Sequence, residues 1–593
     1  MNNKLKTLVI VESPAKAEKI QSFLTNDYIV MASKGHITEL AKGGKHGIGV
    51  NIDNNFKPHY VLSDDKVNVL DALLNAGKKC DMILLATDDD REGTAISWHL
   101  SERLKDLDKP MKRVKFNEIK KAKILKAISS PEEIDMNVVH AQEARRILDR
   151  LVGFTASPFL MQFFGNNLSA GRVQSVVTKM VVDREREIES FVPEDFYTIQ
   201  VSLKKDVEFQ MKFADRITDK NEADKIKNKL SNTKYIVSES ISKDEEKYPL
   251  PPLITSTLQR LMSKLYGISA DRTMKAAQAL YELGFCTYIR TDSVRASDEA
   301  IEDVREFLKN KNLNIPKKPY VYKNKDASQD AHECIRPSDL NIEPKNNYSI
   351  IDPDEKLVYE TIYNYFLASQ MVPAIYSTLK ITAHPINEPK LLVKASGKAL
   401  KSKGFLEVLG INDESKIEIP MLNKKDELEL FGNDPVKVEK KQTQAPPRFS
   451  EDKLIKFLED KSIGRPATYA ELLSKITSRN YVEKKGSVFH ATELGKKITD
   501  VLDKFFTFMD YNYSSNMEHE LDKIEHGKLD HVQMLKNFYP SYKKELERAY
   551  IDNGGTICDK CGNPMSVRVV KASGVKFLSC SNFKFCKNTK NLS

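Results

Sequence analysis

Apolar runs followed by helix-start signals open the chain. Residues 7–11 are typical of a buried strand, and Ser13-Pro14 directly after them is typical of a helix N-cap and first helical position. A second apolar run, residues 81–86, ends abruptly at an acidic segment, and a helical pattern follows over 94–104. Strands that alternate with helices predict an α/β domain with a largely parallel sheet over residues 1–135.

The rest of the chain passes between helical and strand-like patterns more than once. Helical periodicity covers 136–190, 250–370 and 450–549, and strand-like alternation covers 192–245, 376–383 and 417–430. The charged stretch 437–447 ends in two prolines and is typical of a linker. This succession predicts a multidomain α/β plus α+β protein with discontinuous domains. The predicted domains are 1–135, 136–191 with 446–550, 192–249 with 373–445, 250–372, and a cysteine-rich tail at 555–593.

The composition indicates the class of protein and the cellular compartment in which we expect it. The 593 residues include 93 Lys and Arg against 84 Asp and Glu, and 40% are hydrophobic, which is typical of a globular protein of several domains. No run approaches the roughly 18 consecutive apolar residues of a membrane span, and the opening residues lack the apolar core of a secretory signal. We therefore expect a cytoplasmic protein. The net charge of +9 permits a polyanionic partner without identifying one.

Carboxylates follow both predicted strands of the N-terminal domain. Asp88, Asp90 and Glu92 are spaced by two, which in an extended segment places all three on one side and turns Asp89 away. Glu12 follows the first strand, and ligands of parallel sheets gather at the carboxyl ends of strands. Crowded carboxylate oxygens are the ligands that Mg²⁺ prefers, so we predict a magnesium site here. The alternative is a solvated acidic turn.

Four further residues carry weaker signals on their own. Lys16 lies in the first turn of a predicted helix, where an anionic oxygen is favoured, but it is also one of many surface lysines. Tyr288 precedes Arg290 by two residues; a phenol needs help to become a nucleophile, and a core tyrosine is an equally good reading. His332 is a general acid, a phosphate ligand or an ordinary surface residue.

A basic helical stretch suggests contacts with a nucleic-acid backbone. Arg146 and Arg150 lie four residues apart on one predicted helix face, with Asp149 placed to orient them. Gly171, in the segment that follows, would let a phosphate approach the backbone. These features fit phosphate contacts, although an ordinary solvated helix would look the same.

The tail combines four of the seven cysteines with basic and aromatic residues. The spacing C-x2-C, then 18 residues, then C-x5-C suits tetrahedral Zn²⁺ in one structural ribbon, and it does not suit a disulfide framework. Seven Lys and Arg against one Asp from residue 558 onward, with Phe577, Phe583 and Phe585, predict stacking on single strands. The alternatives are a purely structural ribbon and a protein-docking module. The predicted zinc ligands are Cys558, Cys561, Cys580 and Cys586.

Taken together, these motifs resemble the type IA DNA topoisomerases, and within them the bacterial topoisomerase I group more than topoisomerase III. The segments LVIVESPAKAEKI (8–20) and LLATDDDREGTAISWHL (84–100) are similar to the Toprim motifs of that family. The resemblance extends over about residues 5–590 and implies a Rossmann-like Toprim domain joined to a toroidal core with a C-terminal zinc ribbon. The similar core motifs are ARRILDRLVGF (144–154), LSAGRVQS (168–175), TYIRTDS (287–293), AHECIRPSD (331–339) and SIGRPATYAELLSKITSRNYV (462–482).

The resemblance implies ATP-independent relaxation of negative supercoils by transient cleavage of one DNA strand. Tyr288 would attack a phosphodiester to give a 5′-phosphotyrosine and a free 3′-hydroxyl, followed by strand passage and religation. Arg290 and Lys16 would contact the scissile phosphate, Glu12 would lie near the leaving oxygen, and His332 would lie in the phosphate region. No P-loop motif occurs in the chain, which agrees with a reaction that needs no ATP. The residues implied to hold Mg²⁺ are Glu12, Asp88, Asp90 and Glu92.

The resemblance also implies a groove for single-stranded DNA, an arch, and partners. The helical pair 136–191 and 446–550 would bind the strand, 192–249 with 373–445 would form the arch or hinge, and 250–372 would carry Tyr288. We expect single-stranded segments of supercoiled DNA as substrate, RNA polymerase as a partner of the C-terminal region, no membrane, a monomer, and a place on the nucleoid. The implied DNA contacts are His36, Arg145, Arg146, Asp149, Arg150, Phe154, Ser169, Ala170, Gly171, Arg172, Val173, Gln174, Arg290, Thr468 and Tyr481.

Two other classes of function fit parts of the sequence. Toprim carboxylates also occur in primases and nucleases; a primase would not need Tyr288, and a nuclease would release both cut ends. A zinc-ribbon DNA-binding or polymerase-docking protein without topoisomerase activity is the non-enzymatic alternative. It would depend on residues 555–593 for its main activity.

Overall fold

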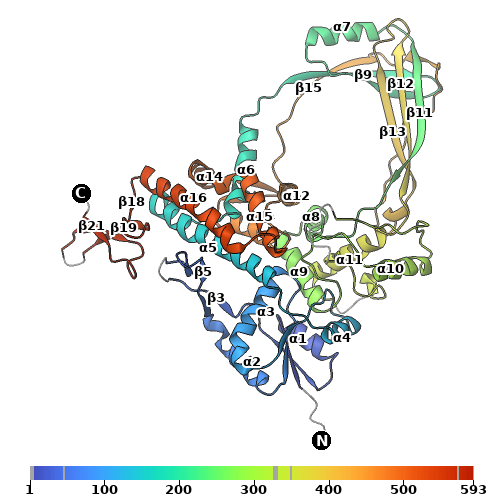
Figure 1. The fold of residues 1–593 in the computed structure, drawn as a ribbon. Helices are drawn as coiled ribbons and strands as arrows, with labels where there is room; N and C mark the ends of the chain where they lie inside the picture. Colours follow the sequence, from blue (N-terminus) through green and yellow to red (C-terminus); the bar gives the residue numbers. More distant parts are fainter. Residues whose placement is uncertain (1–5, 44–46, 325–331, 347–349, 571–572, 592–593) are drawn as a thin grey trace.

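The path of the chain closes into a ring. The computed structural model describes residues 6–43, 47–324, 332–346, 350–570 and 573–591. In Figure 1 a base of helices and an N-terminal sheet lies beneath an arch of long strands, and the tail projects beside the base. Ala331, within the predicted motif 331–339, lies outside the described residues. Within the described ranges, no helix combines the length and apolar character that crossing a bilayer requires.

The N-terminal segment forms the predicted α/β unit. Its four strands pair in parallel in the order β2-β1-β7-β8, and Leu8, Val9 and Ile10 on the central strand are almost fully buried. Ser13 caps the first helix as predicted, since its hydroxyl accepts a hydrogen bond from the Lys16 amide at 3.3 Å. The elements are β1 (Thr7–Val11), α1 (Pro14–Gln21), β2 (Tyr28–Ala32), β3 (Thr38–Leu40), β4 (Val50–Asn51), β5 (Lys57–Pro58), β6 (Tyr60–Leu62), α2 (Val67–Gly77), β7 (Met82–Leu85), α3 (Arg91–Leu104), β8 (Met111–Arg113) and α4 (Lys121–Ser129).

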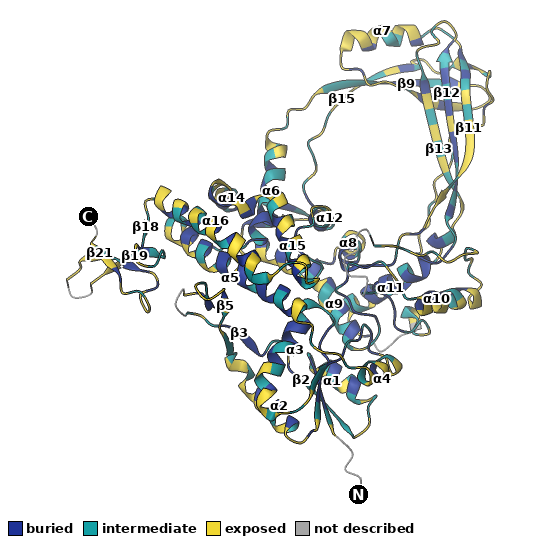
Figure 2. Ribbon diagram, viewed as in Figure 1, coloured by how far each residue is buried: buried dark blue, intermediate teal, exposed yellow. Residues whose placement is uncertain are grey.

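Two distant helical segments share one core. Leu148 and Phe159 of α5 pack in the same cluster as Leu521 and Leu535, which lie more than 350 positions later in the chain. Figure 2 shows this core as the continuous buried band through the base. The elements are α5 (Met136–Phe164), α6 (Gln174–Glu189), α12 (Glu451–Asp460), α13 (Tyr469–Ser478), β16 (Val482–Lys485), β17 (Val488–Ala491), α14 (Glu493–Phe505), α15 (Tyr511–Glu525) and α16 (His531–Asp552).

The arch is a seven-stranded sheet in the order β10-β13-β12-β11-β14-β9-β15, with antiparallel pairing throughout. Two expectations are corrected here. Only the end of 417–430 is a strand, because Pro420 lacks an N–H for a ladder. The stretch expected to be a linker instead contributes β15, which pairs with β9 over seven residues. The elements are β9 (Asp195–Lys204), β10 (Glu208–Phe213), α7 (Lys220–Leu230), β11 (Tyr235–Lys247), β12 (Ala374–Pro385), β13 (Val393–Ser402), β14 (Glu427–Leu430) and β15 (Val436–Gln442).

The helical segment 250–372 packs directly against the N-terminal sheet. Leu280 and Ile289 belong to the same buried cluster as Val9, Leu84 and Ile119. At Gly284, which has a positive φ of 80°, a Cβ would lie 2.8 Å from the carbonyl oxygen of Ile119, so only glycine fits this contact. The helices are α8 (Thr255–Tyr266), α9 (Ala270–Glu282), α10 (Asp298–Asn310) and α11 (Pro353–Ala368).

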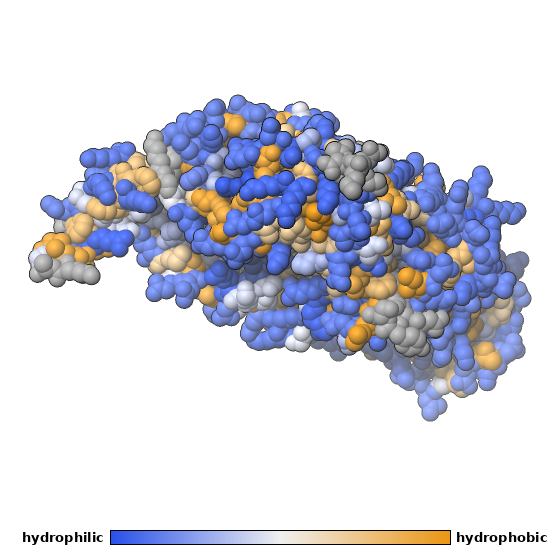
Figure 3. Space-filling model, turned by 90° about the horizontal axis from the view of Figure 1, so that it is seen from below, coloured by the Kyte–Doolittle hydropathy of each residue, from blue (hydrophilic) through white to orange (hydrophobic). Residues whose placement is uncertain are grey.

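The tail folds as a four-stranded antiparallel sheet in chain order. Its outer surface exposes Val567, Val569 and Val575 to more than half of their possible area. In Figure 3 the molecule narrows at the left end of the underside into a projection with apolar surface, and the rest of the face is mostly hydrophilic with separate apolar patches. The strands are β18 (Thr556–Ile557), β19 (Pro564–Val569), β20 (Lys576–Cys580) and β21 (Thr589–Asn591).

Candidate active site and single-strand groove

The acidic turn, residues 88–92, connects the end of β7 to the start of α3. Asp90 is the N-cap of α3, because its carboxylate accepts a hydrogen bond from the Gly93 amide at 2.7 Å. Glu92 therefore lies in the first helical turn, and the expected extended arrangement of three aligned carboxylates is wrong from Asp90 onward. The turn is tight, since a Cβ on Gly93 would lie 2.1 Å from the carbonyl oxygen of Asp88.

Arg113 fixes the backbone of this turn, and no sequence signal pointed to it. Its fully buried guanidinium donates hydrogen bonds to the carbonyl oxygens of Leu85 at 3.0 Å, Thr87 at 2.7 Å and Asp88 at 2.5 Å. Leu85 O also accepts a hydrogen bond from the Val114 amide at 2.9 Å, whereas Thr87 and Asp88 lie beyond the end of β7. The charge-assisted bonds hold the Asp88 side chain at one place on the sheet edge.

Asp88 and Glu12 share the region of Lys16 but differ in protonation. Lys16 Nζ lies 2.6 Å from Asp88 Oδ1 and 3.9 Å from Glu12 Oε2. Burial would raise the pKa of Asp88, but the adjacent Lys16 charge holds it below its usual value. Burial raises the pKa of Glu12 to about 8, and the negative charge of Asp88 adds to that rise. Burial therefore favours the protonated form of Glu12, whereas the charge of Lys16 favours the ionised form of Asp88.

Glu92 is held on the other side of the turn. His36 and Gln142 both hydrogen-bond to its carboxylate, the latter at 3.1 Å. Burial would raise the pKa of Glu92, but the His36 hydrogen bond lowers it to about 2. His36, predicted to contact DNA, thus hydrogen-bonds to a candidate metal ligand.

The donor set suits a hard divalent cation, although each carboxylate already has a protein partner. Oxygen donors from Glu12, Asp88, Asp90 and Glu92 surround one turn, and the pKa shifts keep Asp88 and Glu92 ionised. In the part of the chain that the structure describes, only the four tail cysteines place three or more ligand atoms within 4.8 Å of one another. An ion at the acidic turn would therefore compete with Lys16 and His36 for these oxygens.

Tyr288 is both a core residue and a part of this site. Its ring packs in the cluster between the N-terminal sheet and segment 250–372, while its hydroxyl donates a hydrogen bond to Asp90 Oδ2 at 2.5 Å. Arg290 Nη1 lies 3.6 Å from the same oxygen, and the Tyr288 amide donates to Asn117 O at 2.7 Å. Burial and then the charges of Asp90 and Asp88 raise the pKa of the phenol well above its usual value. Only 5% of Tyr288 is exposed, so the side chain is largely shielded from solvent.

His332 links the segment after α10 to the acidic turn. Its Nε2 donates a hydrogen bond to the carbonyl oxygen of Asp89 at 2.9 Å. Asp89, to which we assigned no role, therefore contributes its backbone. Both residues line a pocket of about 200 Å³ that also borders Tyr288, Asn117 and Thr291. A phosphate in this pocket would meet the Tyr288 side chain and the imidazole together.

A cleft of about 850 Å³ runs from the acidic turn along α5 to the start of α13. It joins the candidate catalytic residues Asp90, Glu92, Arg290 and His332 to part of the predicted DNA-binding set. A single strand lying in this cleft would contact guanidinium groups on one wall and carboxylates at its end. The predicted DNA contacts that line it are Arg145, Arg146, Asp149, Arg290 and Thr468.

Other predicted DNA contacts lie outside the cleft in this state. Arg172 is fully buried and pairs with Glu518 at 2.9 Å and Asp149 at 3.4 Å. The Tyr481 hydroxyl donates to Ser169 O at 2.9 Å and accepts from Ser169 N at 2.7 Å, which fixes the turn before α6. Ala170, Gly171 and Val173 belong to the same turn, and Gln174 is the first residue of α6.

Arg150 and Phe154 form a surface pair on α5. The Arg150 guanidinium lies over the Phe154 ring at 4.0 Å from its centroid, and 45% of Phe154 is exposed. An aromatic ring with a cation on its face offers an unpaired base a place to stack. This pair fits the predicted role without sharing the cleft.

Charged residues that join α15 to the acidic turn were missed by sequence reasoning. Arg91 Nε donates to Glu525 at 2.7 Å, and its Nη2 donates to Asp522 at 2.5 Å. Arg465 Nη2 donates to the other oxygen of Asp522 at 2.5 Å. Arg91 and Arg465 both line the cleft. Arg465 stands in the motif at 462–482, which was the available signal; the acidic partners on α15 carried none.

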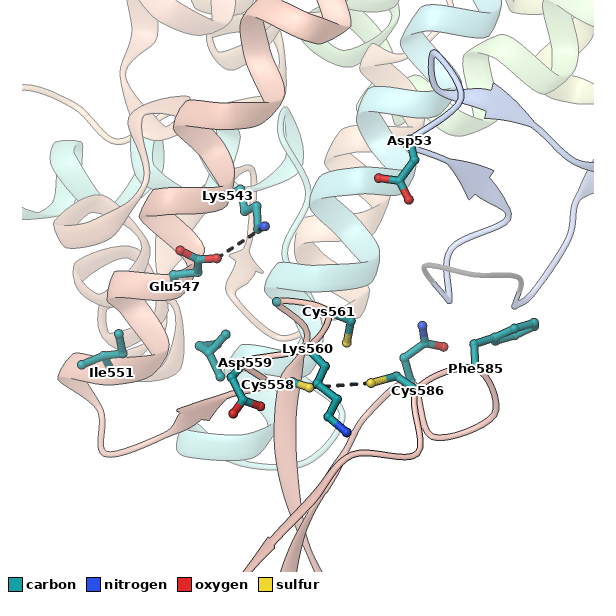
Figure 4. A pocket seen from close by; sticks show the side chains of 13 residues that line it. Asp53, Lys543, Glu547, Ile551, Cys558, Asp559, Lys560, Cys561, Phe585 and Cys586 are labelled. Atoms are coloured by element: carbon teal, nitrogen blue, oxygen red, sulfur yellow. Dashed lines mark hydrogen bonds and ion pairs between the residues drawn. The ribbon is translucent and has the colours of Figure 1, made fainter.

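The four tail cysteines meet at one point. Cys558 and Cys586 sulfurs are 3.7 Å apart and those of Cys561 and Cys580 are 3.4 Å apart. Sulfur atoms around tetrahedral Zn²⁺ are separated by about 3.8 Å, so the donor set fits a structural zinc. The Asn588 side-chain amide donates to Cys558 Sγ at 3.1 Å, which favours a thiolate. Figure 4 shows the sulfurs of Cys558, Cys561 and Cys586 near α16, whose Lys543 and Glu547 line the same pocket.

Comparison with known proteins agrees with this geometry. The family described as DNA topoisomerase matches residues 133–536, and the Toprim domain matches residues 7–119. The chain belongs to the type IA DNA topoisomerase family. The alternatives of a primase, a nuclease and a zinc-ribbon DNA-binding protein are therefore not favoured, because a match to the DNA topoisomerase family over residues 133–536 is not expected for any of them.

Individual relatives extend over nearly the whole chain. DNA topoisomerase 1 of Pseudomonas aeruginosa is 38% identical over 647 residues, which cover 99% of this chain and 73% of that protein. DNA topoisomerase 1 of Helicobacter pylori is 37% identical and is covered to 82%. The structure of full-length topoisomerase I from Thermotoga maritima is similar with a TM-score of 0.81 and 33% identity, covering 99% of this chain and 97% of that one. This type IA chain is thus most like bacterial topoisomerase I.

Proposed function

We propose that this chain relaxes negatively supercoiled DNA without ATP, by cutting and rejoining one strand through Tyr288. The Tyr288 oxygen forms a bond to the scissile phosphorus, and the bond from phosphorus to the 3′-oxygen breaks. The observation that supports this most is the Tyr288 hydroxyl on Asp90, at the end of a cleft lined by arginines. The phosphotyrosine ester conserves the bond energy, so religation needs no nucleotide cofactor.

The neighbouring side chains suit the proton transfers and charges of this reaction. Asp90 accepts the phenol hydrogen bond and is placed to take its proton. Arg290 and Lys16 are cations on either side of the turn and would stabilise the phosphorane charge. Glu12, whose protonated form is favoured by burial, would supply a proton to the leaving 3′-oxygen. His332 would contact the phosphate from the pocket beside Tyr288.

The DNA path, the metals and the partners complete the proposal. Arg145, Arg146, Asp149 and Thr468 would contact the strand in the cleft, with Arg150 and Phe154 beyond it. Glu12, Asp88, Asp90 and Glu92 would hold Mg²⁺, which supplies charge neutralisation for rejoining. The four cysteines would hold one structural Zn²⁺, and the basic tail would bind RNA polymerase or single strands. We assign a cytoplasmic, nucleoid-associated monomer with the domain limits given above.

The direct test is to locate the protein–DNA bond. A single-stranded oligonucleotide labelled at its 3′ end is incubated with the full chain, and the reaction is stopped with detergent. We expect a labelled band at the mass of the protein plus the downstream fragment, and peptide mass spectrometry should place the nucleotide on Tyr288. Nucleotide on another residue, or cut DNA with no attached protein, would overturn the proposal.

Removal of divalent cations is expected to stop plasmid relaxation. EDTA in excess should leave negatively supercoiled plasmid unchanged on an agarose gel, and added Mg²⁺ should restore relaxed topoisomers. The Asp88→Asn variant should need more Mg²⁺ than the wild type, whereas Asp65→Asn, an exposed change outside the acidic turn, should not. Full relaxation under complete chelation would contradict the metal assignment.

A further inference from the structure

Tyr281 lies within the active site although no motif singled it out. It is on α9, seven positions before Tyr288, and its side chain is fully buried. Its hydroxyl donates a hydrogen bond to Asp88 Oδ1 at 3.2 Å, the same oxygen that Lys16 contacts at 2.6 Å. Two donors therefore converge on one carboxylate oxygen of the acidic turn, and Tyr281 supplies one of them.

The ring of Tyr281 makes two further contacts in the site. Lys16 Nζ lies 4.9 Å from its centroid, over the face of the ring, where the aromatic quadrupole attracts a cation. The ring also packs edge-on against Tyr288, with centroids 5.3 Å apart and planes at 66°. One side chain thus touches the lysine, the carboxylate and the nucleophile.

These contacts join two parts of the chain that are far apart in sequence. Lys16 and Asp88 belong to the Toprim match at 7–119, whereas Tyr281 and Tyr288 belong to segment 250–372. The two parts meet through side chains and through the backbone hydrogen bond from the Tyr288 amide to Asn117 O, so Tyr281 reaches Asp88 only while they are docked. When the two parts separate, Lys16 loses its contact with the Tyr281 ring and Asp88 loses the hydrogen bond from the Tyr281 hydroxyl. Both side chains then gain freedom to reorient in water.

We propose that Tyr281 is a positioning residue that arranges Lys16 and Asp88 for cleavage only when Tyr288 is docked beside them. This inference rests on the proposed function of the site. Tyr281 lies on α9 and Tyr288 lies in the segment that follows this helix, so one stretch of the chain delivers both the proposed nucleophile and the group that orients the lysine. Cleavage chemistry is thereby coupled to closure of the ring, and the Toprim side chains are less well arranged whenever the nucleophile is withdrawn.

The Tyr281→Phe variant removes the hydroxyl and keeps the ring. We expect its single-turnover rate of protein–DNA bond formation, at saturating oligonucleotide, to fall on the order of tenfold, as for the loss of one hydrogen bond to a charged group. Its affinity for single-stranded DNA should stay at the wild-type value, because Tyr281 is buried away from the cleft. Tyr281→Leu, which also removes the ring over Lys16, should be slower still.

The matched control is Tyr359→Phe on α11. Tyr359 is 1% exposed and its hydroxyl donates to the Ile342 carbonyl at 2.7 Å, outside the site. Both phenylalanine variants are compared at a temperature below the melting point of either. Equal cleavage rates for the two, or weaker DNA binding in place of a slower step, would overturn the inference. If the wild type forms no protein-linked DNA, the proposed function is wrong. If the wild type forms it and Tyr281→Phe cleaves as fast as Tyr359→Phe, only the inference about Tyr281 is wrong.

Discussion

Replacing Tyr288 with phenylalanine is expected to abolish protein-linked DNA while leaving the fold and DNA binding intact. Phenylalanine keeps the ring in the buried cluster but has no oxygen to attack phosphorus. Loss of the nucleophile should reduce cleavage by at least about 10⁴-fold, the scale seen when covalent enzymes lose theirs. The hydroxyl donates only to Asp90, a carboxylate that is 15% exposed and can turn to water or Arg290, so little stability should be lost.

The measurement is a denaturing gel of labelled oligonucleotide together with plasmid relaxation. Tyr363→Phe is the matched control, because Tyr363 is a buried tyrosine of α11 whose hydroxyl donates to the Leu340 carbonyl at 2.7 Å. It should retain both activities. Continued cutting by Tyr288→Phe, with both DNA ends free, would instead identify a nuclease.

Replacing Glu518 with leucine should cause the largest loss of stability. Glu518 and Arg172 are both fully buried, and Arg145 lies 4.0 Å from the same carboxylate. Burial would raise the pKa of Glu518, but the charges of Arg145 and Arg172 hold it far below its usual value. Removing the carboxylate leaves the buried Arg172 guanidinium with the half-exposed Asp149 carboxylate, 3.4 Å away, in place of a buried counter-charge, which costs about 3–5 kcal/mol of unfolding free energy.

Urea unfolding that follows the helical base would measure this loss. Glu493→Leu on α14 is the control, since that carboxylate is 90% exposed in its pair with Lys496 and should contribute little. The double variant with Arg172→Met should recover part of the stability, because an apolar pair removes both buried charges. If Glu518→Leu unfolds at the same urea concentration as Glu493→Leu, the buried pair is not important for stability.

Local patterns anticipated the parts of the structure that depend on neighbouring residues. The strand at 7–11 and the Ser13 cap are confirmed because burial and capping act within a few positions. The acidic turn shows the limit of that reasoning: Asp90 is a strong N-cap residue, and its capping bond starts a helix where an extended segment was predicted.

Long-range contacts account for what the sequence could not predict. Arg172 is a charged residue of the kind expected at the surface, but it is buried in a pair with Glu518, 346 positions later in the chain. Arg113 donates to carbonyl oxygens at and beyond the end of β7, and these come within its reach only once β7 and β8 have paired. Tyr281 is a site residue only because α9 packs beside Asp88 in the folded chain. Each of these depends on which segments meet in space.

The apolar seam between the N-terminal sheet and segment 250–372 has a thermodynamic consequence for strand passage. Val9, Leu84, Leu280 and Ile289 are dry when the two parts are docked, and drawing them apart wets all of them. Wetting costs about 25 cal/mol for each square ångström of apolar surface, so the hydrophobic effect opposes separation of the two parts and favours their return to contact. In a type IA topoisomerase this bias would bring the two ends of a cut strand back together for rejoining.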